Sequence, residues 1–171
     1  MRVMSLYDAT IPVFIKYLRN LDRWIEKAQA HAQRKKFDPE ILLQARLSPD
    51  QFPFLQQVQA ACDATKYAAA KLAGKEPPAH PDVEKTIDEV RARVRTAVAY
   101  LESVKREELE GADERAVAHT WMQGKHMRGS DYVNEFALPN FLFHVTTAYA
   151  ILRHNGAELG KMDFIGGLSL R

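Results

Sequence analysis

The most informative stretch of this chain is LPNFLFHVTTAYAILRHNG, residues 138–156. Its apolar residues recur at the three-and-four spacing of a helix face, and the Asn155-Gly156 pair is typical of a helix end. Polar side chains nevertheless lie on this apolar segment: Asn140, His144, Arg153 and His154. A helix apolar enough for a protein core therefore carries the first candidate functional site.

Two long helices are predicted in the first half of the chain. The first covers residues 10–33, with Thr10 as its cap and Pro12 in its first turn. A short helix follows at Asp38-Pro39-Glu40, and a second long helix then begins near residue 54 and ends at Gly74. Its buried stripe consists of Phe54, Val58, Cys62, Thr65, Ala69 and Leu72. The small residues in this stripe allow a neighbouring helix to approach closely.

Residues 74–81, GKEPPAHP, are predicted to be a crossing loop, because their three prolines lack the amide protons that a helix needs. Asp82 would then cap a third helix that ends near residue 104. This loop is too short to link two domains.

The pattern changes between Gly111 and Gly129, where two short extended segments flank a turn at Gln123-Gly124. An isolated hairpin is marginally stable, so Trp121 and Met122 are expected to hold this one against the helices. The last helix would run from about residue 130 to 154 with a bend or break at Pro139, and the tail after Gly156 is expected to be irregular.

These elements predict an all-α protein with a single domain over residues 1–171. Its architecture would be a four-helix bundle with a crossover connection, a short helix between the first two long helices, and a small β-hairpin before the last helix.

Composition excludes several classes of protein. The 24 basic and 22 acidic residues are interleaved, so the chain lacks the concentrated positive field of a nucleic-acid-binding protein. The one cysteine, Cys62, excludes an intramolecular disulfide and a cysteine-based zinc cluster. No run approaches the roughly 20 apolar residues that span a bilayer, and no cleavable leader is recognised. We therefore expect a cytoplasmic protein without a nucleic-acid or membrane partner.

The candidate site combines residues from two helices. Asn140 and His144 are four residues apart, so they lie one turn apart on the same helix face. That is the spacing of a metal-ligand pair, although only the imidazole is a good transition-metal ligand. The second helix offers Gln59 and Asp63, which are also four residues apart. We therefore hypothesise that these four side chains line a polar pocket between the two helices.

Three groups of residues resemble an uncharacterised bacterial family in the DinB/YfiT-like superfamily of metal-dependent four-helix bundles. The resemblance covers nearly the whole chain. It rests on SLYDATIP (5–12), DQFP (50–53) with QVQAACD (57–63), and LPNF (138–141) with FHV (143–145) and ILR (151–153).

The resemblance implies a metal site of three histidines, one on the second helix and a His-x-x-x-His pair on the last. This sequence has Asn140 at the first position of the pair and His144 at the second, and it lacks the second-helix histidine. His144 is thus the one remaining candidate metal ligand. A zinc or nickel ion, and the thiol-transferase or hydrolase chemistry of relatives, would depend on an incomplete ligand set.

Several candidate residues also have purely structural interpretations. His144 would then be a core histidine bonded to Asn140 or Asp63, and Cys62 a small core residue. Arg153 and His154 would interact with the negative end of the helix dipole. His119 and His126 would be exposed loop residues, although two histidines beside a turn could also bind a metal.

Three functions follow from these observations. The preferred one is a DinB-like bundle whose degenerate metal-type pocket binds a small molecule without a tightly held metal. The first alternative is a divalent-metal-dependent hydrolase or thiol transferase that uses His144 and Asp63. The second is a structural or regulatory homodimer, and a dimer is compatible with all three functions. The sequence specifies neither the ligand nor the dimer face.

Overall fold

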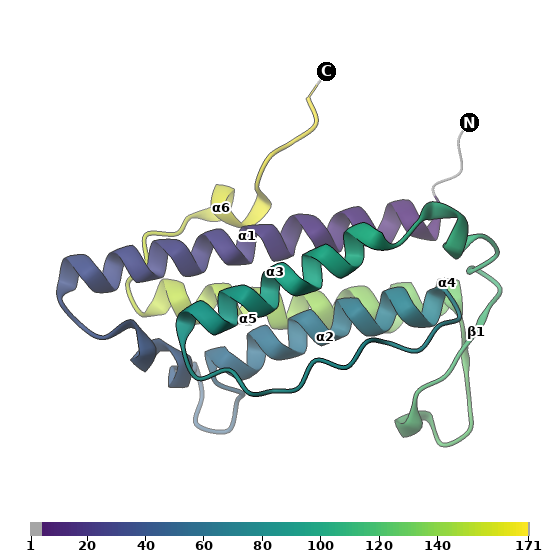
Figure 1. Cartoon of the computed structure of the whole chain (residues 1–171), viewed down its shortest axis with the longest axis horizontal. Helices are drawn as coiled ribbons and strands as arrows, with labels where there is room; N and C mark the ends of the chain where they lie inside the picture. The colour runs from purple at the N-terminus through teal and green to yellow at the C-terminus, as the bar shows by residue number, and fades with distance from the viewer. Residues whose placement is uncertain (1–4, 171) are drawn as a thin grey trace.

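Four long helices form the body of the protein (Figure 1). The computed structural model describes residues 5–170. The long helices are α1 (Leu6–Lys35), α2 (Phe54–Leu72), α3 (Ile87–Ser103) and α5 (Leu138–His154). Helices α1 and α5 run in one direction and α2 and α3 in the other, while α2 packs on α5 and α1 packs on α3. The predicted all-α four-helix bundle is confirmed.

The connection between α2 and α3 crosses the length of the bundle. After α2 ends, residues 73–86 run back along it, so that α3 starts at the same end of the bundle as α2 (Figure 1). The predicted short helix between the first two long helices is the 3-10 helix η1 (Pro39–Gln44), which Asp38 caps by accepting a hydrogen bond from the Glu40 amide. Both connections agree with the sequence prediction.

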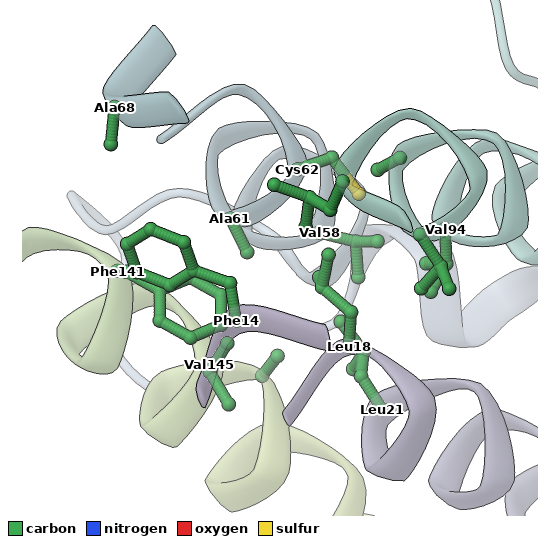
Figure 2. Close-up of a cluster of buried hydrophobic side chains, with 14 of the residues drawn as sticks. Phe14, Leu18, Leu21, Val58, Ala61, Cys62, Ala68, Val94, Phe141 and Val145 are labelled. Carbon is green, nitrogen blue, oxygen red and sulfur yellow. The ribbon is translucent and has the colours of Figure 1, made fainter. Parts of the chain in front are cut away.

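The core lies where the four long helices meet. Figure 2 shows Phe14 of α1 against Phe141 of α5, and their ring centroids are 5.0 Å apart in an edge-to-face arrangement. Helix α2 contributes mainly small side chains, including the fully buried Ala61 and Ala68, so its neighbours approach closely. Within residues 5–170, no helix combines the length and apolarity that a bilayer crossing needs.

Two helices begin at other residues than predicted. Helix α1 starts at Leu6 because the Ser5 hydroxyl accepts a hydrogen bond from the Asp8 amide. Thr10 lies inside the helix, and its hydroxyl donates a hydrogen bond of 2.6 Å to the Leu6 carbonyl. Helix α3 starts at Ile87 instead of after Asp82, because Thr86 and Glu89 form a capping box. In both cases a better cap lies a few residues from the predicted one.

The predicted hairpin is present but smaller and more irregular. Strand β1 (Ala116–Val117) pairs antiparallel with β2 (Met127–Arg128), and the 3-10 turn η3 (Thr120–Met122) lies in the loop between them. Another 3-10 helix, η2 (Arg106–Leu109), precedes the hairpin. Met122 is buried, and Trp121, although 57% exposed, contacts Phe136 directly before α5, so both residues lie against the helices as expected.

The last long helix has an irregular beginning. Helix α4 (Gly129–Tyr132) continues through a π-helical turn, η4 (Val133–Ala137), directly into α5, where Pro139 lies in the first turn. The predicted interruption at Pro139 is therefore a π turn immediately before it. A π turn adds a residue to the helix and rotates the side chains that precede it, which is a frequent feature of binding sites.

The tail is more ordered than predicted. It forms the helix α6 (Lys161–Ile165), which lies along α1 (Figure 1). The Trp24 indole donates a hydrogen bond of 3.0 Å to the Asp163 carbonyl, and the Phe164 ring stacks on Trp24. The Asn20 side-chain amide donates a hydrogen bond of 2.9 Å to the Phe164 carbonyl. These side-chain contacts hold a segment whose own sequence has no helical periodicity.

Candidate functional site

A pocket of about 310 Å³ lies between α2, α5, the π turn and the hairpin loop. We call it the His144 pocket. Its walls combine aromatic rings, small alanines and a few polar groups. The lining residues are Ala60, Asp63, Ala64, Tyr67, His119, Trp121, Tyr132, Phe136, Ala137, Asn140 and His144.

Three of the four residues predicted from the sequence line this pocket. Asn140 and His144 lie one turn apart on α5, and Asp63 faces the pocket from α2. Gln59 instead lines a neighbouring hollow beside the crossing loop. There its Nε2 donates a hydrogen bond of 2.9 Å to the Glu84 carboxylate. Asp63 lines both hollows and lies at their boundary.

The hydrogen-bond partner of His144 is Gln57, not Asn140 or Asp63 as expected. The distance between His144 Nδ1 and Gln57 Oε1 is 2.8 Å. The nitrogen of the Gln57 side-chain amide sets its orientation, because Nε2 donates a hydrogen bond of 3.1 Å to the Phe52 carbonyl. The amide oxygen facing His144 can only accept, so Nδ1 carries the imidazole proton.

This bond determines the chemistry of the other ring nitrogen. With the proton on Nδ1, Nε2 of the neutral ring has a free lone pair. Burial lowers the pKa of His144, which favours the neutral form. His144 therefore presents a hydrogen-bond acceptor and weak base rather than a positive charge.

Asp63 belongs to an ion-pair network beneath the pocket. Its Oδ1 accepts from Lys66 Nζ at 2.8 Å and from Arg93 Nη2 at 3.0 Å. The guanidinium of Arg93 also pairs with Asp82 and Glu84 of the crossing loop, at 2.8 and 3.0 Å. This network ties the loop to α2 and α3 and fixes the position of the Asp63 carboxylate.

An aromatic wall closes the hairpin side of the pocket, and it consists of His119, Trp121, Tyr132 and Phe136. His119 Nε2 lies 3.1 Å from the Tyr132 hydroxyl, and the His119 ring stacks on Trp121. The Trp121 ring also contacts Phe136, with centroids 5.1 Å apart. Burial and the charge of Lys71 lower the pKa of His119.

The sequence interpretation missed this wall. It placed His119 with His126 as exposed loop residues, but His119 is half-buried in the pocket, while His126 is exposed and does not line it. Tyr132 and Phe136 were not singled out, although their spacing of four residues would have placed them on one helix face. Gln57 was also missed, and its signal was a polar residue between Phe54 and Val58 on the buried side of α2.

The donor groups do not fit a tightly bound transition metal. His144 contributes one imidazole, Asn140 a neutral amide, and Asp63 a carboxylate already paired with two cations. Within residues 5–170, no three His, Cys, Asp or Glu side chains converge as a metal-ligand group. Structural and catalytic zinc sites need at least three protein ligands, so the degenerate sequence pattern corresponds to a degenerate donor set.

The remaining candidate residues have structural roles. Cys62 is buried in the core, where burial raises the pKa of its thiol to about 12, so it is not a nucleophile near neutral pH. Arg153 and His154 are exposed in the last turn of α5, where the negative end of the helix dipole favours basic side chains.

Comparison with known proteins places this architecture in a family. A family described as "Domain of unknown function (DUF1993)" matches residues 6–165. The chain belongs to this family. The DUF1993 chain is also similar to a crystal structure of a DinB family member from Shewanella denitrificans, with a TM-score of 0.93 and 42% sequence identity. The match covers 97% of this chain and 94% of that chain, so the DinB-like fold is confirmed.

No functionally curated protein matches the DUF1993 chain. The family description and the similar structure state no ligand or reaction. The function is therefore inferred from the His144 pocket itself.

Proposed function

We propose that this protein binds a small organic molecule in the His144 pocket without a tightly held metal ion. The observation that carries the proposal is the hydrogen bond between His144 and Gln57, which places a proton on Nδ1 and leaves Nε2 of the neutral ring as the acceptor on the wall of the pocket. A structural histidine would also need the bond to Gln57, but here the second ring nitrogen, Nε2, has no partner among the described residues and can accept from a ligand.

The composition of the pocket supports this proposal. Its volume of about 310 Å³ is at the lower end of the range for small-molecule sites, which runs from about 300 to 1,000 Å³. Apolar and aromatic walls with a few polar groups are typical of such sites. Here the polar groups come from Asp63, Asn140 and His144, on two different helices.

A fragment screen by ligand-observed NMR tests the proposal. The protein would be treated with a chelator and screened against fragments of about 8–15 non-hydrogen atoms, a size suited to so small a pocket. Ala64→Phe fills the pocket from α2, and Ala99→Phe, on the exposed side of α3, is the matched control.

The two variants distinguish the outcomes. We expect fragments that bind the wild type and Ala99→Phe but not Ala64→Phe. If no fragment binds the chelated wild type, or if Ala64→Phe binds equally well, this proposal fails. If binding appears only after zinc or nickel is added, the metal-dependent alternative takes its place.

A homodimer stays a prediction of the sequence. Light scattering coupled to size-exclusion chromatography would test it, because a mass near twice 19.5 kDa would indicate a dimer. The small-molecule proposal does not depend on that result, since all the pocket residues come from one chain.

A further inference from the structure

We infer that the His144 pocket selects a small protonated amine with an apolar body. The inference rests on the proposed function, because it names the ligand class of the same pocket. Three features of the lining support it: the type of hydrogen-bonding atom, the local charge, and the aromatic wall.

Two acceptors on the pocket lining, one on His144 and one on Asp63, have no partner among residues 5–170, and the Asn140 amide, which can both donate and accept, also has none. Nε2 of His144 has a lone pair because Nδ1 carries the proton, and both cations bound to Asp63 use Oδ1, which leaves Oδ2 free. Within residues 5–170, the one side-chain nitrogen or oxygen that is both fully buried and without a partner is Arg93 Nε, so these two acceptors reach solvent. A ligand that satisfies them must bring its own N–H or O–H donors.

The local charge favours a cation over a neutral donor. Asp63 is the one formally charged side chain on the lining, since the lowered pKa values of His119 and His144 leave both rings neutral at pH 7. The network beneath contains three carboxylates, of Asp63, Asp82 and Glu84, and two cations, of Lys66 and Arg93. Its formal charge is −1, so an ammonium group would balance it while an anion would be repelled.

The aromatic wall suits both parts of such a ligand. An ammonium within about 6 Å of a tryptophan or tyrosine ring gains a cation–π interaction, and an apolar body packs against the same rings. Trp121 contacts His119 and Phe136 and is 57% exposed, so more than half of its side-chain surface is accessible to a ligand. The neighbouring Tyr67 already interacts with one ammonium, because Lys66 Nζ lies 5.3 Å from its ring centroid.

Three size-matched ligands separate charge from shape. They are 3-phenylpropylammonium, the neutral 3-phenylpropan-1-ol and the anionic 3-phenylpropanoate, each titrated calorimetrically into chelator-treated protein at pH 7.5. We expect the amine to bind about tenfold more tightly than the alcohol, and the carboxylate to bind least.

Variants assign this preference to the pocket. Trp121→Leu should weaken binding of the amine about fivefold or more while Trp121→Phe restores most of it. Met162→Leu, at an exposed position on α6 outside the pocket, should change nothing. Asp63→Asn should reduce the preference for the amine over the alcohol. If that variant does not fold because Arg93 and Lys66 lose the charge of Asp63, the Trp121 series still carries the test.

The outcomes distinguish this inference from the proposed function. Equal or tighter binding of the alcohol or the carboxylate overturns the amine inference but leaves a small-molecule pocket in place. Binding of NMR fragments without binding of any of the three ligands also overturns it. An absence of both fragment and amine binding overturns the amine inference and the proposed function together.

Discussion

Two aromatic clusters lie on the outside of the bundle, and they differ in what they leave open. In the tail cluster, Trp24 stacks on Phe164 of α6 and contacts Tyr149 of α5 edge to face. Trp24 is 1% exposed and its indole N–H donates to the Asp163 carbonyl. In the aromatic wall, Trp121 is 57% exposed, and the rings of the wall line the His144 pocket.

The difference shows how packing and binding use the same residue types. In the tail cluster, chain folded back onto α1 covers the rings and satisfies their polar atoms. Beside the aromatic wall, Nε2 of His144 and Oδ2 of Asp63 have no partner within the described chain and remain accessible. Accessible acceptors beside aromatic rings are what a ligand site requires, and a packing cluster has no use for them.

The largest expected effect is on the tail cluster. Trp24→Ala should lower the free energy of unfolding by about 3–5 kcal/mol, because it removes a buried ring and the hydrogen bond that holds α6. Urea unfolding followed by circular dichroism measures the change. A loss below about 1 kcal/mol would show that the tail cluster is not part of the core.

A slightly smaller effect is expected beneath the pocket. Arg93→Leu should cost about 3 kcal/mol, since it leaves Glu84 without its buried cation and Asp63 with Lys66 alone. Arg95→Leu is the control, because that guanidinium is 62% exposed and pairs only on the surface, and it should cost less than about 1 kcal/mol. Similar costs for the two variants would mean that the network does not fix Asp63.

His144 is expected to contribute less, and its contribution should depend on pH. At pH 7.5, His144→Gln should cost about 1–2 kcal/mol through the lost bond to Gln57. Burial lowers the pKa of His144 in the folded state, so its stabilisation is complete above the unfolded value of about 6.5 and is lost as the pH falls toward the folded value.

Urea unfolding of both proteins between pH 7.5 and 5 measures this dependence. The gap in stability between wild type and His144→Gln should narrow as the pH falls. His119 also has a lowered pKa, but it is present in both proteins and cancels. A gap that widens toward pH 5 would mean that His144 is charged in the folded protein.

The smallest effect on stability is expected at the aromatic wall. Trp121→Ala should change the free energy of unfolding by about 0.5 kcal/mol or less, because the indole is mostly exposed. The same urea titration as for Trp24→Ala measures it. A cost above about 2 kcal/mol would make the two aromatic clusters alike and remove the distinction between packing and binding.

The sequence predicted the architecture because the bundle depends on periodic patterns. The helical stripes, the three prolines of the crossing loop and the glycine that ends α2 are local signals, and they placed the four long helices, the crossover and the hairpin. Helix starts were less accurate because Ser5 and Thr86 compete with neighbouring caps. The order in α6 arises from contacts with α1, which a local pattern does not encode.

The pocket was only partly predictable for a similar reason. The spacing of Asn140 and His144 placed both on one face, and Asp63 followed from the facing helix. The bond of Gln57 to His144 depends on how α2 meets α5, and the contacts within the aromatic wall depend on how the hairpin meets the π turn. The tautomer of His144 could be assigned only from the carbonyl that Gln57 contacts.

The most direct test of the account measures ligand affinity and metal content on the same protein. The dissociation constant of a fragment that binds the wild type would be measured before and after chelation, with metal content determined by plasma mass spectrometry on tag-free wild type and His144→Ala. If the His144 pocket binds its ligand without a metal, the dissociation constant should stay unchanged and the protein should hold far less than one metal ion per chain. A stoichiometric metal that disappears in His144→Ala, together with loss of binding after chelation, would contradict it.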